Sequence, residues 1–70
     1  MTVTFASELK KMRQIARSCY LAGIPYELGL VPSPSITCQF DDAAEFIAWH
    51  ALFVGQFGWS PYDCEASLSA

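Results

Sequence analysis

The segment from Phe46 to Gly58 constrains the fold most, because it predicts a helix with almost no polar face. Its only strongly polar side chains are those of His50 and Gln56. A helix that is apolar nearly all round must be covered on more than one side. The chain has only 70 residues, and a domain of this size buries only about 60% of the surface that its unfolded chain exposes. We therefore expect part of this helix to meet a partner.

The start of this helix is marked by acidic residues. Asp42 and Glu45 fit a variant of the capping box, and Asp41 is the neighbouring candidate for the cap. The helix should run from there to about Phe57, and Gly58 should end it. Trp49 and Leu52 are expected off the main apolar stripe, which the spacing assigns to Ala43, Phe46 with Ile47, His50, Phe53 with Val54, and Phe57.

An amphipathic helix is predicted before Gly23, which is a natural stop followed by Pro25. Its apolar side repeats at helical spacing through Leu9, Met12, Ile15 with Ala16, Cys19 and Ala22. Its polar side carries Lys10, Lys11, Arg13, Gln14 and Arg17.

Strand patterns lie between and outside the two helices. Residues 26–31 and 36–40 alternate apolar and polar side chains around the turn Pro32-Ser33-Pro34-Ser35, which predicts a hairpin. Residues 1–5 fit a short first strand. The tail, residues 59–68, fits either a last strand or a packed coil, and Pro61 weakens the strand interpretation.

The predicted fold class is α+β: one domain, residues 1–70, with two helices packed on a small antiparallel sheet. The central order is α-β-β-α. If both flanking strands form, the order becomes β-α-β-β-α-β, the split arrangement of ferredoxin-like folds.

Charge is distributed unevenly along the chain. The net charge is −3; the 4 basic residues all lie between Lys10 and Arg17, and no base follows Gly23. Direct nucleic-acid binding needs basic surface to neutralise phosphates, which the acidic part cannot supply. That part is suited to a basic protein surface, or serves solubility alone. The stripe of Lys10, Arg13 and Arg17 is a rival, phosphate-contacting surface, although a solvated helix face is the favoured explanation.

No pattern of catalytic or metal-binding residues is present, so we expect a protein that is not an enzyme and needs no cofactor. Cys19, Cys38 and Cys64 are scattered singly, and with His50 they lack the paired spacing of structural zinc sites. Reduced, buried thiols in a cytoplasmic protein are expected instead. The longest apolar run is too short to predict a membrane span.

Aromatic and acidic residues supply the predicted contact surface. Trp49, Trp59, Tyr62 and Tyr26 are candidates for an exposed aromatic patch, with acids around it. Glu45 and Trp49 are four residues apart and share a helix face, which makes them the leading pair. The predicted partner-binding residues are Glu27, Asp41, Asp42, Glu45, Trp49, Trp59, Tyr62 and Asp63.

A compact, acidic, motif-free chain of this length resembles the small proteins that bacteriophages encode to disable host machinery, including anti-CRISPR proteins. The resemblance covers the general character of the chain; Phe40–Ile47 is a common strand-to-helix junction. It implies inhibition by stoichiometric binding to a host protein in the bacterial cytoplasm, such as a Cas protein or effector complex with a basic surface. The alternative is a structural or assembly protein that forms a homodimer or larger homo-oligomer through its apolar second helix.

Overall fold

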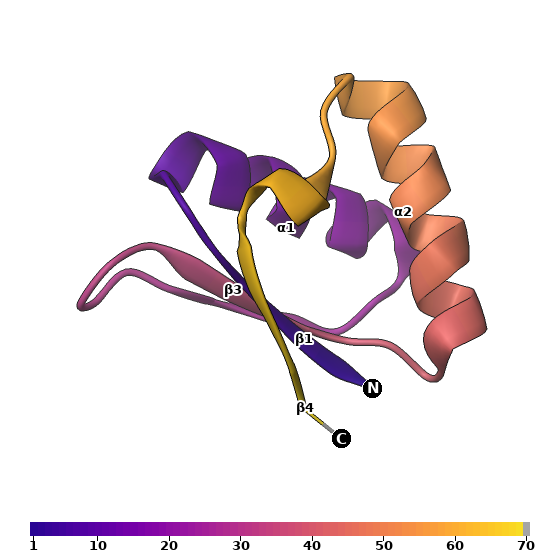
Figure 1. The fold of residues 1–70 in the computed structure, drawn as a ribbon, viewed down its shortest axis with the longest axis horizontal. Helices are drawn as coiled ribbons and strands as arrows, with labels where there is room; N and C mark the ends of the chain where they lie inside the picture. Colours follow the sequence, from indigo (N-terminus) through magenta and orange to yellow (C-terminus); the bar gives the residue numbers. More distant parts are fainter. Residues whose placement is uncertain (70) are drawn as a thin grey trace.

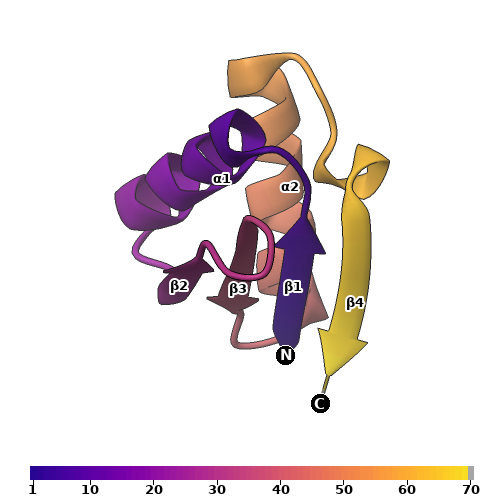
Figure 2. The same cartoon turned by 90° about the vertical axis from the view of Figure 1, so that its left-hand side faces the viewer.

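The computed structural model describes residues 1–69 and contains four strands and two long helices in the order β-α-β-β-α-β (Figure 1). The sheet is antiparallel throughout, with strand order β2-β3-β1-β4 (Figure 2). This is the split arrangement of ferredoxin-like folds, so the predicted fold class is confirmed and the tail forms a strand. The elements are β1 (Thr2–Ala6), α1 (Leu9–Ala22), β2 (Tyr26–Gly29), β3 (Ser35–Gln39), α2 (Ala43–Phe57), the 3₁₀ turn η1 (Pro61–Asp63) and β4 (Glu65–Ser69).

The sheet has one face under the helices and one open face, as the alternation of its strands requires. In the central strands, Val3 and Phe5 of β1 and Ile36 and Cys38 of β3 are buried. Their neighbours along the strands point to the open face, which carries threonine, serine and glutamine side chains between Glu27 and Glu65. The core therefore lies in a single layer between the sheet and the two helices.

Helix α1 has the predicted amphipathic form. Met12, Ile15, Ala16 and Cys19 are buried in the core. The helix ends at Gly23, whose φ of 72° lies in the left-handed region that favours glycine.

Helix α2 begins at the predicted capping box. The backbone N–H of Glu45 donates to Asp42 Oδ1 over 2.8 Å, and Glu45 Oε1 accepts from the N–H of Asp41 over 2.8 Å. These two bonds satisfy donors that have no partner within the helix. Asp42 is therefore the cap, and Asp41 contributes its backbone.

The buried side of α2 differs from the predicted stripe. Phe46, Trp49 and Phe53 are buried, whereas Ile47 and Val54 are exposed. The sheet and α1 contact the side of the helix that carries Trp49, so the core forms around the large rings. The predicted stripe was therefore wrong for Ile47 and Val54, and the assignment of Trp49 to another side was also wrong.

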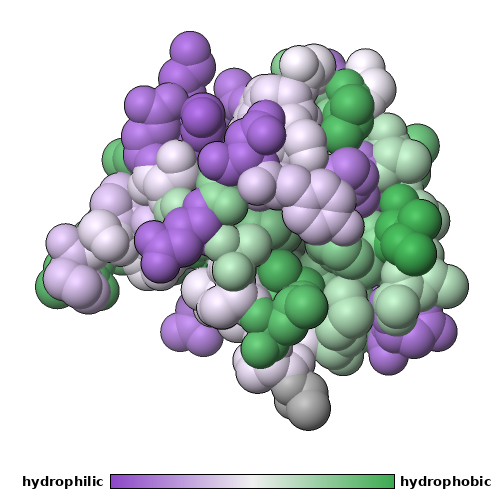
Figure 3. Space-filling model, viewed as in Figure 1, coloured by the Kyte–Doolittle hydropathy of each residue, from purple (hydrophilic) through white to green (hydrophobic). Residues whose placement is uncertain are grey.

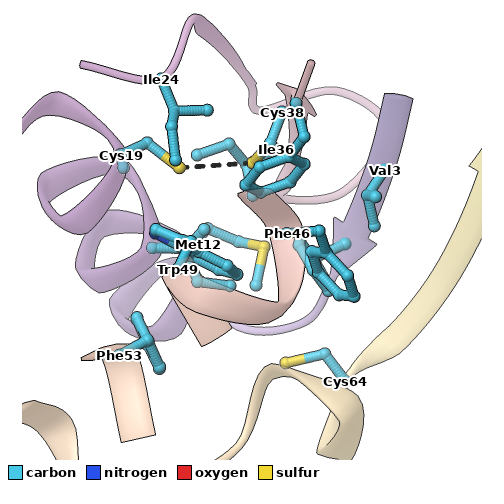
Figure 4. Packing of buried hydrophobic residues seen from close by; sticks show 14 residues of the cluster. Val3, Met12, Cys19, Ile24, Ile36, Cys38, Phe46, Trp49, Phe53 and Cys64 are labelled. Atoms are coloured by element: carbon cyan, nitrogen blue, oxygen red, sulfur yellow. Dashed lines mark hydrogen bonds between the residues drawn. The ribbon is translucent and has the colours of Figure 1, made fainter. Parts of the chain in front are cut away.

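Aromatic rings make up the centre of the core (Figure 4). The Trp49 ring lies 5.3 Å from Phe40, 5.4 Å from Phe53 and 6.1 Å from Phe5, measured between centroids. These are ordinary packing distances for aromatic pairs. Trp49 thus joins α2 to both central strands, β1 directly and β3 through the Phe40 that follows it.

Candidate functional site

The side of α2 that faces away from the core is the leading candidate for a binding surface. We define the outer face of α2 as its exposed residues without charge or strong polarity between the cap and the last turn. Helical spacing places them on one side, and no charged residue occurs in α2 after Glu45. The outer face of α2 consists of Ala43, Ala44, Ile47, Ala48, Ala51, Leu52, Val54 and Gly55.

Large aliphatic side chains stand out from this face between small ones. Ile47 is 63% exposed and Leu52 is 70% exposed. A Cβ added at Gly55 would meet no atom within 4 Å, so the fold itself does not require glycine there. Glycine inside a helix costs about 1 kcal/mol relative to alanine. The small residues leave room for another element to approach the helix backbone closely.

Two hollows flank the outer face of α2. A hollow of about 360 Å³ lies between α2 and β4, with Ile47, Tyr62 and Leu68 on its lining. A second, of about 280 Å³, lies between α1 and α2 and is lined by Leu21, Leu52 and Trp49 among others. Figure 3 shows hydrophobic atoms over α2 and again in front of β4. The apolar surface is therefore wider than one helix face.

The indole of Trp49 leaves one polar atom without a partner. Its side chain is 2% exposed, and Nε1 has no hydrogen-bond partner among the described residues. A buried donor left unpaired costs about 1–3 kcal/mol. Trp49 also lines the hollow between α1 and α2, but its Nε1 has almost no accessible surface and is not open to a ligand there.

The predicted acidic residues do not form one rim. Asp41, Asp42 and Glu45 gather at the start of α2, joined by the two capping bonds. Glu27 lies on the edge strand β2 and points to the open face of the sheet opposite Thr37, while Asp63 lies in η1. The first three acids adjoin the outer face of α2 at the start of the helix.

The predicted exposed aromatic patch does not form as a whole, because part of it belongs to the core. Trp49 is buried, so the expected contact surface of Glu45 and Trp49 does not form. Trp59 is partly buried; its Nε1 donates to Gln14 Oε1 over 2.6 Å, and Lys11 Nζ lies 5.4 Å from its ring. It fastens the segment after α2 to α1. Of the four predicted patch aromatics, Tyr62 and Tyr26 are exposed, and Tyr26 lies on the edge strand β2.

Tyr62 and His50 pack together beside the hollow at β4. Their ring centroids are 4.5 Å apart, and His50 Nε2 lies 2.9 Å from Ser60 Oγ. Ser60 Oγ also accepts the backbone N–H of Tyr62 over 3.1 Å. His50 is therefore engaged in fixing the turn after α2. Within residues 1–69, no three His, Cys, Asp or Glu side chains are grouped closely enough to hold a metal ion.

The cysteines lie in the core, as predicted. Cys19 Sγ and Cys38 Sγ are 3.6 Å apart and fully buried, joining α1 to β3. The hydrogen bond to Cys38, together with burial, raises the pKa of the Cys19 thiol well above its ordinary value. Because the thiolate is the reactive form, this pair is suited to packing and not to nucleophilic chemistry.

The predicted basic stripe is exposed on α1. Lys10, Arg13 and Arg17 line a shallow depression together with Leu9 and Gln14. Neither this depression nor the open sheet face contains an aromatic side chain, and the open face contains no base. Stacking of nucleic-acid bases on aromatic rings is therefore not provided for on these surfaces.

Sequence reasoning did not name Ile47, Leu52 and Val54 as candidates for a binding surface, although it placed Leu52 off the main apolar stripe; the structure shows that all three are exposed. The spacing of these residues alone did not reveal that they are exposed, because both sides of α2 are apolar. The available signal was the separation of side-chain types: Phe46, Trp49 and Phe53 lie on one side, and small or aliphatic residues lie on the other.

In comparisons with protein-family models, curated proteins and solved structures, the chain matches none of them. Neither helix in residues 1–69 is both long and apolar enough to cross a bilayer.

Proposed function

We propose that this chain is a stoichiometric protein-binding inhibitor, of the kind that phages direct against a nucleic-acid-handling protein or complex in the bacterial cytoplasm. The observation that carries the proposal is the outer face of α2, which exposes aliphatic side chains without any charge. An exposed apolar face bordered by polar residues is typical of protein–protein contact sites.

The acidic residues at the start of α2 favour a target with basic residues beside its contact surface. Asp41, Asp42 and Glu45 lie at one end of the outer face, so a partner with an apolar centre and basic residues beside it would fit. A Cas protein or effector complex, whose nucleic-acid channel is basic, has this character. The net charge of −3 is mild, which favours a specific contact over wholesale imitation of nucleic acid.

The hollow between α1 and α2 supplies a place for an anchoring side chain. Leu21 and Leu52 are exposed beside it, and the largely buried Trp49 also lines it. A partner side chain with an apolar body would match these walls. In protein interfaces, most of the binding energy comes from a few residues buried in central pockets of this kind.

The test is affinity capture from a host bacterial lysate with the tagged protein, compared with two variants. Leu52→Lys places a charge in the outer face of α2, and Val31→Lys places the same charge at the fully separate hairpin tip, where Val31 is 90% exposed. We expect one host protein or complex to be captured stoichiometrically by the wild type and by Val31→Lys, but not by Leu52→Lys.

The captured protein should then lose activity when the purified wild type is added in equimolar amounts. Capture by Leu52→Lys equal to that by the wild type would show that the outer face of α2 is not the contact surface. Capture without inhibition would reduce the function to that of an adaptor.

The homo-oligomer is the second candidate, because an uncharged helix face can also pack against its own copy. Sedimentation of the wild type beside Leu52→Lys separates the two candidates. A wild-type oligomer that Leu52→Lys dissociates supports self-assembly through α2.

A further inference from the structure

The outer edge of β4 has no partner strand within the described residues. The sheet order places β4 at one edge and β2 at the other. Edge strands present unpaired backbone groups and are usually protected by proline, lysine or a bulge. Proline brackets β2 at Pro25 and Pro32, whereas β4 contains neither proline nor lysine and every residue of it is exposed.

The hydrogen-bond pattern of the sheet identifies which groups of β4 point outward. Met1 and Phe40 exchange both backbone bonds, N–H of Phe40 to O of Met1 over 2.8 Å and the Met1 amino group to O of Phe40 over 2.7 Å. Because such pairs alternate along an antiparallel ladder, Val3 and Phe5 bond toward β3, and Thr4 bonds toward Ser67 in β4. The N–H and C=O groups of Ala66 and Leu68 are therefore directed to the free edge.

We propose that β4 pairs antiparallel with β4 of a second copy, about a two-fold axis at Ser67. This register uses all four outward groups, because Ala66 of each copy bonds with Leu68 of the other. On the helix side of the sheet, it places the small side chain of Ala66 opposite the large side chain of Leu68. It also places Glu65 opposite Ser69. Like charges directly opposite each other would be destabilising, and this register has none.

The side chain of Leu68 gains cover in this dimer. Leu68 points to the helix side, since it pairs with the buried Val3, yet it is 71% exposed. It lies on the lining of the hollow between α2 and β4. A second β4 beside it would bring Ala66 of the partner against its uncovered side.

The opposite edge is less suited to self-pairing. The bond from Gln39 N–H to the carbonyl of Pro25 shows that Tyr26 and Leu28 have the outward backbone groups of β2. The register that uses both of them would place Glu27 directly opposite Glu27 of the other copy. Like-charge opposition of this kind disfavours β2 relative to β4.

The experiment is analytical ultracentrifugation of the full chain over a concentration series reaching the millimolar range, with Ala66→Pro and Leu68→Lys as variants. Proline at position 66 removes an outward N–H without removing a bond to β1, and it is tolerated where the N–H faces solvent. We expect a concentration-dependent wild-type dimer, retained by Val31→Lys and lost in both β4 variants. Circular dichroism checks that each variant is folded; if Ala66→Pro unfolds, Leu68→Lys carries the test alone.

Amide hydrogen exchange gives a second readout on the wild type. The amides of Ala66 and Leu68 should become protected as concentration rises, whereas that of Ser67 should be protected throughout. A wild type that stays monomeric over the whole series, or a dimer that Leu52→Lys abolishes and Leu68→Lys does not, would overturn the proposal. Leu52 lines the hollow between α1 and α2, whereas Leu68 lines the one between α2 and β4. The two variants therefore act on different sides of α2, and loss of the dimer can be distinguished from loss of the partner contact that Leu52→Lys tests.

Discussion

Leu52 and Phe53 are neighbours in α2, yet their side chains lie in opposite environments. Phe53 is fully buried against Trp49 and Phe57, while Leu52 projects from the outer face of α2. The contrast follows from the 100° step between successive residues of a helix, which turns one side chain inward and the next outward.

This pair yields a stability prediction. Phe53→Ala should lower the free energy of unfolding by about 3–5 kcal/mol, because it leaves a cavity in the core. Leu52→Ala should change it by less than about 0.5 kcal/mol, as for other exposed positions. Urea unfolding followed by circular dichroism measures both, and equal losses for the two variants would contradict the assigned orientation of α2.

The cysteines give a chemical prediction at the same scale. Burial of Cys19, Cys38 and Cys64 and the raised pKa of Cys19 predict little reaction with a thiol-specific alkylating reagent at neutral pH. In denaturant all three should react rapidly, as ordinary thiols do. Mass spectrometry of the alkylated protein counts the modified sites; rapid labelling of the folded chain would show that the core opens readily.

At the scale of the element, the capping box at the start of α2 can be tested by one substitution and its neighbour. Asp42→Ala should cost about 0.5–2 kcal/mol, because it removes the oxygen that accepts the N–H of Glu45. Asp41→Ala should cost much less, since Asp41 contributes its backbone N–H and not its carboxylate. Chemical denaturation compares the two. A greater loss of stability for Asp41→Ala would show that Asp41, and not Asp42, is the cap.

Helix α2 also shows where sequence periodicity stops being informative. Its limits and its cap were predictable, because Asp42, Glu45 and Gly58 are local signals. Its buried side was not, because an apolar residue occurs at nearly every angle around the helix. The position of the sheet and α1 selected the aromatic side, and this selection left the aliphatic side as the candidate site.

For the whole molecule, Trp49 is a natural probe of cooperativity, because its ring contacts β1 and the residue after β3 from α2. In Trp59→Phe, which leaves Trp49 as the only tryptophan, the fluorescence and far-ultraviolet circular dichroism transitions should coincide in urea. A small domain with one core unfolds as a single unit. Separate transitions would show that α2 detaches before the sheet unfolds.

The sequence by itself determined the central α-β-β-α order, both helices, the hairpin and the α+β class, because each rests on local signals such as caps, turns and the periodicity of apolar residues. Only the tertiary structure decided that Trp49 belongs to the core and Leu52 to the surface, that the acids divide between separate regions, and that β4 completes the sheet with a free outer edge. These properties depend on which surfaces face each other across the fold. Contacts between residues far apart in the chain set that arrangement, and local patterns do not encode it.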